Sequence, residues 1–219
     1  GDISLNAGAD TYSYAQIGNG GDTGSHNDSG NITVTAGDSI FLAGGTDYAQ
    51  IGNGGWGSNG SSGAVTVTAA GDITLTGADN SPWGYAQIGD GGQFSTGTAN
   101  GTVVVTANGT VTLTAGHHGM YAQIGNGGNQ LLGYSSTGNS AGGNVTVNAV
   151  NISMVGYSNA SGADDYAQIG NTAITANGTV TAGGNVVLNV TGTTSIDSAA
   201  GGDVVWIGNR ANGGTETGA

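Results

Sequence analysis

The pentapeptide Tyr-Ala-Gln-Ile-Gly occurs five times in this chain, at Tyr14–Gly18, Tyr48–Gly52, Tyr85–Gly89, Tyr121–Gly125 and Tyr166–Gly170. A degenerate sixth copy reads Val-Val-Trp-Ile-Gly at Val204–Gly208. Successive copies start 34, 37, 36, 45 and 38 residues apart. A near-constant period along the whole chain is typical of one structural unit that is repeated along an axis.

The pentapeptide alternates like a β-strand, with Ala and Ile on one face and Tyr and Gln on the other. Small and branched apolar side chains suit a narrow interior, so we predict an inward core column of Ile17, Ile51, Ile88, Ile124, Ile169 and Ile207. The opposite face is predicted to point outward and to carry two ladders. The Tyr ladder consists of Tyr14, Tyr48, Tyr85, Tyr121 and Tyr166, and the Gln ladder consists of Gln16, Gln50, Gln87, Gln123 and Gln168.

Each Gln amide is expected to hydrogen-bond the copies above and below it, as stacked identical strands allow. Two roles are open for the Tyr rings, which offer a large apolar area with a polar tip. They either stack on each other and stabilise the coil, or they contact sugar rings or a neighbouring rod. Trp206 takes the Gln position in the degenerate copy, which makes it a candidate interface residue.

Two other short, alternating strands recur between the pentapeptides, for example Ile32–Thr35 and Ile40–Leu42. From Ile32 to Ile40 is 8 residues and from Ile40 to Ala49 is 9, but from Ala49 to Val65 is 16. The additional residues of the longest spacing lie in one loop after each Gly-rich corner, at 56–64, 93–101 and 129–143. These spacings predict an all-β fold, a parallel β-solenoid (β-helix) with about 36 residues per repeat, three strands per coil and one long variable loop.

We expect a single solenoid domain of five to six coils over residues 1–209, followed by a polar tail over residues 210–219. Stability in such a fold comes from contacts between neighbouring coils, and a terminal coil without a cap exposes unpaired strand edges. No capping unit is recognisable at either end of the sequence. The segment is therefore expected to stack end to end with copies of itself or to continue into neighbouring solenoid repeats.

The charge of the chain narrows the range of partners. The sequence contains 14 acidic residues and one basic residue, Arg210, and its formal net charge is −13. Nucleic acid and anionic membrane surfaces would repel it, and no apolar run approaches the roughly 20 residues that span a bilayer. We therefore expect no nucleic-acid partner and no membrane insertion. An enzyme that cleaves acidic polysaccharides needs cationic groups beside its base, so a single Arg also argues against catalysis.

Asp and His residues are the candidate metal ligands of this chain. Calcium takes six to eight oxygen ligands, and the best isolated acidic pair is Asp164 and Asp165. The Gly-Gly-x-Gly-x-Asp nonapeptide of calcium-binding repeats does not recur in this chain. The adjacent His117 and His118 would face opposite ways on a strand, which does not favour a zinc site. We expect no cofactor, with calcium as the open alternative.

Pairs of Thr separated by one residue recur on the other strands, at Thr33/Thr35, Thr66/Thr68, Thr74/Thr76 and Thr112/Thr114. These side chains are predicted to point outward, and a flat array of Thr is similar to the ice-binding surface of some antifreeze proteins. The array is interrupted by Phe41, Val104, Asn148 and Val187, and Thr is also an ordinary residue on a strand face. An ice-binding or carbohydrate-binding module is therefore the alternative function.

The phrases at Gly30–Gly37, Gly71–Thr76 and Gly109–Gly116 share the pattern Gly-x-Ile/Val-Thr-Val/Leu-Thr. With these phrases, the chain resembles the repeat region of filamentous-haemagglutinin-type adhesins, which are large bacterial surface proteins exported by two-partner secretion. The resemblance implies a right-handed parallel β-helix, display outside the cell at the bacterial surface, and a role as a fibre, stalk or biofilm matrix component. Host or matrix glycans are expected as further partners of such an adhesive segment. The resemblance carries over no catalytic residue.

Overall fold

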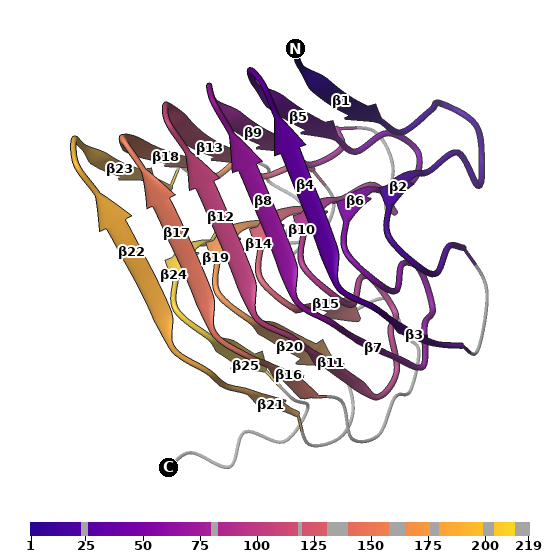
Figure 1. The fold of residues 1–219 in the computed structure, drawn as a ribbon. Coiled ribbons are helices and arrows are strands. Elements are labelled where there is room, and N and C mark those ends of the chain that lie inside the picture. The colour runs from indigo at the N-terminus through magenta and orange to yellow at the C-terminus, as the bar shows by residue number, and fades with distance from the viewer. Residues whose placement is uncertain are drawn as a thin grey trace.

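The computed structural model describes residues 1–22, 26–79, 83–117, 120–130, 140–157, 165–175, 180–198 and 204–212. Within these ranges the chain is all-β, and equivalent strands of successive repeats lie side by side in five parallel sheets (Figure 1). The strands form a β-solenoid of about five turns. No helix in the described ranges is long and apolar enough to cross a membrane.

Three sheets surround the main core. Sheet I contains β1 (Ile3–Asn6), β5 (Ile40–Ala43), β9 (Ile73–Thr76), β13 (Thr110–Thr114), β18 (Asn151–Val155) and β23 (Thr194–Asp197). Sheet II is made by the pentapeptides and contains β2 (Ala15–Ile17), β6 (Ala49–Ile51), β10 (Ala86–Ile88), β14 (Tyr121–Ile124), β19 (Tyr166–Ile169) and β24 (Val204–Ile207). Sheet III contains β4 (Ile32–Ala36), β8 (Val65–Ala69), β12 (Val103–Ala107), β17 (Val145–Ala149) and β22 (Val186–Val190).

Two further sheets are formed by residues that lie between sheets II and III in the chain. Sheet IV contains β3 (Asn27–Ser29), β7 (Gly60–Ser62), β11 (Thr98–Asn100), β16 (Ser140–Gly142) and β21 (Thr181–Ala182). Sheet V contains β15 (Gly127–Gln130), β20 (Thr172–Thr175) and β25 (Arg210–Asn212). The expectation of three strands per coil with one extruded loop is therefore too simple, because much of the loop pairs with its neighbours as additional strands.

The main core is filled by the inward side chains of sheets I, II and III. Ile51, Ile88, Ile124 and Ile169 are fully buried in it, and Ile17 and Ile207 pack against it half-buried. Each pairs in register with the Ile of the next coil, so like packs on like. Burying each such side chain contributes about 1.5–3 kcal/mol, which makes this column a main source of stability.

The first residues of the predicted polar tail, 210–219, belong to the solenoid. Residues Arg210–Asn212 do not belong to a tail, since they form β25 and pair with β20. The Arg210 guanidinium lies over the Tyr166 ring, with Cζ 5.9 Å from the ring centroid, so a cation–π contact holds this strand against sheet II. Residues 213–219 lie outside the described part of the chain.

Candidate functional site

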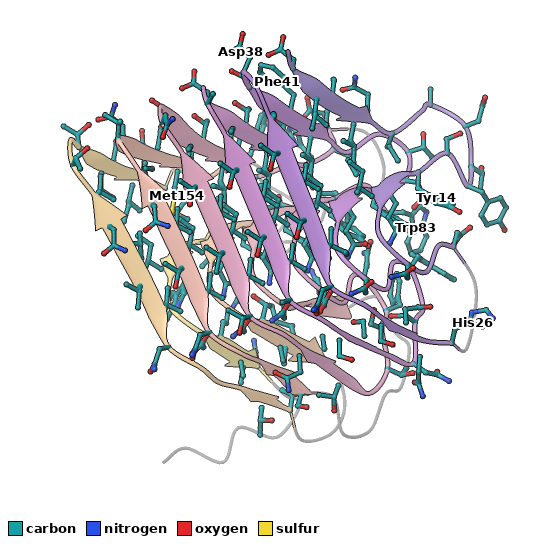
Figure 2. The ribbon with its side chains drawn as sticks, in the orientation of Figure 1. Tyr14, His26, Asp38, Phe41, Trp83 and Met154 are labelled. Carbon is teal, nitrogen blue, oxygen red and sulfur yellow. The ribbon has the colours of Figure 1, made fainter. Side chains whose placement is uncertain are left out.

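The Tyr ladder forms a continuous stack of rings. Adjacent ring centroids are 5.1, 5.0, 4.7 and 4.8 Å apart, and adjacent ring planes lie within 11° of each other. Tyr48, Tyr85, Tyr121 and Tyr166 are fully buried, whereas Tyr14, labelled in Figure 2, is the first ring of the stack and is 41% exposed. The ladder was predicted to point outward, and four of its five members are buried all the same.

A second core explains this burial. The Tyr rings point away from the main core, but Ile174 of sheet V and the side chain of Trp56 pack on them. The Gly-Gly corners allow the chain to pass close to the rings: a Cβ at Gly92 or at Gly128 would lie less than 3.0 Å from a Tyr hydroxyl. The stack is therefore not a surface on which sugar rings dock.

The Gln ladder joins each coil to the backbone of the next. Gln87 is fully buried, and its Nε2 donates to the carbonyl oxygens of Gly125 at 3.0 Å and Gly127 at 2.9 Å. The equivalent bonds of Gln50 go to Gly89 and Gly91. The predicted bonds between Gln amides are not what the structure contains, because each amide is already occupied by main-chain carbonyls.

Tyr hydroxyls complete this network. Three of the five hydroxyls donate to the Gln Oε1 of the preceding coil, at 3.5 Å for Tyr85 to Gln50, 3.4 Å for Tyr121 to Gln87 and 3.1 Å for Tyr166 to Gln123. Burial, reinforced by the neighbouring Tyr rings, raises the pKa of the Tyr85 and Tyr121 hydroxyls well above the usual range. The hydroxyls therefore stay neutral and keep their proton for donation.

Replacing Tyr166 with Phe is expected to lower the free energy of unfolding by about 1–2 kcal/mol, because the stack is retained but the buried Gln123 Oε1 loses its donor. Tyr14→Phe is the matched control, since Tyr14 is partly exposed and should change stability by less than about 0.5 kcal/mol. Urea unfolding followed by circular dichroism measures both values. Equal effects of the two substitutions would contradict a structural role for the hydroxyl.

A third ladder follows each pentapeptide and was not singled out in the sequence. It consists of Asn19, Asn53, Asp90, Asn126, Asn171 and Asn209. After Asn19, each Oδ1 accepts the main-chain N–H of the equivalent residue in the preceding coil, for example Asp90 N–H to Asn126 Oδ1 at 2.8 Å. The Nδ2 of Asn126 donates to the carbonyl oxygens of Gly101 and Gly142 at 2.7 and 2.6 Å. The available signal was the repeated Asn directly after each pentapeptide.

Asp90 is the exception in this Asn ladder. Its Oδ1 accepts the N–H of Asn53 at 2.8 Å, but its buried Oδ2 has no hydrogen-bond partner. Burial raises the pKa of the Asp90 carboxyl to about 6, although hydrogen bonds from Asn53 partly oppose this shift. An ionised carboxylate is a poor substitute for an amide here, because it has no N–H group to donate to the carbonyls around it.

The acidic pair proposed for calcium is only partly described. Asp164 lies outside the described residues, and Asp165 is buried with its Oδ1 accepting the Met120 N–H at 3.1 Å. The described residues contain no group of three or more His, Cys, Asp or Glu side chains placed to hold a metal ion. His117 lies against Tyr157, with ring centroids 3.6 Å apart, and His118 lies outside the described residues.

Acidic residues at the corner between sheets III and I support the backbone of the next coil. The Oδ1 atoms of Asp2 and Asp72 accept the N–H groups of Ser39 at 2.9 Å and Thr110 at 2.7 Å. Asp38 occupies the same corner, at the edge of the sheets (Figure 2). These carboxylates fix the corners of the solenoid.

Aromatic side chains form one more cluster that sequence reasoning missed. Trp56, Trp83 and Phe94 have ring centroids 5.5 to 6.5 Å apart, and Trp56 joins them to the Tyr core. Phe94 has a φ of 57°, a left-handed conformation that is unusual for a bulky residue. The cluster closes the flank of the second core.

Trp206 differs from the Gln residues whose position it occupies. It lies on β24, pairs in register with Gln168 and is 45% exposed. The Gln168 amide still reaches the next coil, donating to the Gly208 carbonyl at 2.9 Å. The exposed Trp206 indole is available for contact, and the role of Trp206 as an interface residue remains a prediction.

The outer face of sheet III is a regular polar array. One row contains Thr33, Thr66, Val104, Thr146 and Val187, and the second row contains Thr35, Thr68, Thr106, Asn148 and Asn189. All ten side chains are half-buried or exposed. Asn148 and Asn189 form a side-chain ladder with Thr106, through bonds of 3.1 and 2.8 Å.

A groove of about 380 Å³ runs across the corner between sheets I and II. It is lined mainly by small residues of three coils, including Ala7, Gly8, Gly44, Gly45 and Gly77.

Comparisons of the chain with protein-family models, with curated proteins and with solved structures found no match.

Proposed function

We propose that this chain is a non-catalytic structural or adhesive protein, a β-solenoid segment that acts outside the cell as a surface fibre or adhesin stalk. The observation that supports it most is the use made of the strictly repeated residues. The Tyr, Gln and Asn ladders direct their polar groups at neighbouring coils and make the segment rigid along its axis. A spacer or fibre needs such rigidity.

Right-handed winding, a repeat of about 36 residues and display at a bacterial surface belong to the same proposal, and the support for them is the adhesin-like repeat phrases. Stacking on neighbouring repeats or on further copies is supported by the edge strands, for example β4 and β22 of sheet III, each of which has one strand neighbour in the described residues. Host or matrix glycans are the proposed receptors.

Negative-stain imaging of the purified chain, at several protein concentrations and with and without calcium, tests this proposal. We expect rod-shaped particles, because the coils stack along one axis (Figure 1). Long, uniform filaments that grow with concentration support assembly into a fibre, and separate short rods support a stalk, whose glycan binding is then screened on an array. Irregular particles without a rod axis would contradict both forms of the proposal.

A further inference from the structure

The side chains on the outer face of sheet III are regularly spaced and uncharged. Its two rows lie wholly within the described residues and contain no Asp, Glu, Lys, Arg or His, although the chain carries a net charge of −13. Figure 1 shows the five strands as one row of nearly parallel arrows. Stacked strands that carry side-chain ladders favour a sheet with less than the ordinary twist.

The side chains of this face form a two-dimensional grid. The Tyr stack shows that successive coils are 4.7 to 5.1 Å apart, and alternate residues of a strand are separated by about 6.6–6.8 Å. Thr33, Thr35, Thr66 and Thr68 occupy four adjacent grid points. Because β-branching restricts χ1, these Thr residues present their hydroxyl and methyl groups in a fixed orientation.

Such a surface suits a partner that is flat, periodic and uncharged. Its two rows have no charged side chain to bind an ion and no aromatic ring on which a sugar could stack. A second copy would bring two highly acidic molecules together, with Asp38 and Asp72 at the corner that borders this face. An ordered water surface fits these requirements, because the Thr hydroxyls can bind water and the methyl groups between them order the intervening water.

We propose that the outer face of sheet III binds the surface of ice, with the grid centred on Thr66 and Thr68 as the contact. Val104 continues the shape of the Thr row because Val and Thr have similar outlines, and Thr106 and Thr146 extend the grid onto β12 and β17. This inference is independent of the proposed role as a fibre or stalk.

Thermal hysteresis and inhibition of ice recrystallisation, measured on the purified chain, test the proposal. We expect both activities in the unmodified chain and their loss in Thr66→Tyr, whose ring stands above the grid and separates it from a flat crystal. Thr112→Tyr is the matched control, because Thr112 has an outward position on sheet I, and it should retain both activities. Tyr suits a strand, so both variants should keep the melting temperature of the parent chain.

The proposal is overturned if the folded parent chain has neither activity, if Thr66→Tyr retains them, or if both variants lose them equally. Binding of the parent chain to microcrystalline cellulose or chitin that Thr66→Tyr abolishes, without any effect on ice, would assign the face to a polysaccharide instead. A dimer in size-exclusion chromatography that Thr66→Tyr dissociates would assign it to a second copy and would also overturn the proposal.

Discussion

Gly125→Ala is expected to destabilise the solenoid by about 4 kcal/mol or more, or to prevent folding. Gly125 has a φ of 145°, and a Cβ there would lie within 3.0 Å of the Gly170 carbonyl of the next coil. Sheet II fixes both backbones, so neither can move away without loss of strand pairing. A displaced Gly170 carbonyl would also leave the Gln123 amide, which donates to it at 3.2 Å.

Two glycines that lack this close approach provide controls. Gly57 has a φ of 77° but no atom near its added Cβ, so Gly57→Ala should cost only about 1 kcal/mol. Gly183→Ala meets no atom and should change stability by less than about 0.5 kcal/mol. Urea unfolding gives the three values, and soluble yield is compared where a variant does not fold. A Gly125→Ala protein as stable as Gly57→Ala would refute the close packing of these glycines.

The main core could be predicted from the sequence because it depends on local alternation and on repetition. Ile51 and Ile88 alternate with polar neighbours and recur at the same place in each period, so their strand, their face and their partner in the next coil all follow. These are properties of short stretches of chain. The parallel solenoid followed from them because one repeated unit of this length has to pack on its own copies.

The second core could not be predicted in the same way. Alternation shows that Tyr85 and Gln87 share a face, but it does not show what covers that face. The segments that approach that face, such as β15 (Gly127–Gln130), are rich in Gly and Asn and lack the apolar pattern of a buried strand. Their pairing depends on register with the neighbouring coil, which only the structure shows.

The strict repetition of Tyr and Gln was the signal in the sequence that these ladders are buried. Tyr and Gln are identical in all five complete copies, whereas the exposed rows of sheet III vary among Thr, Val and Asn. A polar side chain in a solvated ladder tolerates replacement, but one that bonds the next coil within a dry core does not. The Asn after each pentapeptide follows the same rule, and its replacement at Asp90 therefore has a measurable consequence.

Asp90→Asn is expected to stabilise the chain by about 2–3 kcal/mol above pH 7. The pKa of Asp90 is about 6 in the folded chain, against a usual value of 3.8. Between these values the folded state holds a proton that the unfolded state has released, so this residue's contribution to stability falls as pH rises from about 4 to 6 and stays low above that range. Asn also supplies an amide that can donate to main-chain carbonyls, as Asn126 does.

The decisive measurement is the difference in unfolding free energy between Asp90→Asn and the parent chain, from pH 4 to pH 8. Subtraction removes the contribution of Asp47, whose pKa burial and the nearby Asp22 raise to about 6 as well. We expect the difference to grow through pH 4 to 6 and then to level off. Asn126→Asp is the reciprocal variant: it places a carboxyl in the same ladder and should lose stability over a similar range. A difference that is constant with pH would show that Asp90 is not held in a dry, amide-specific position.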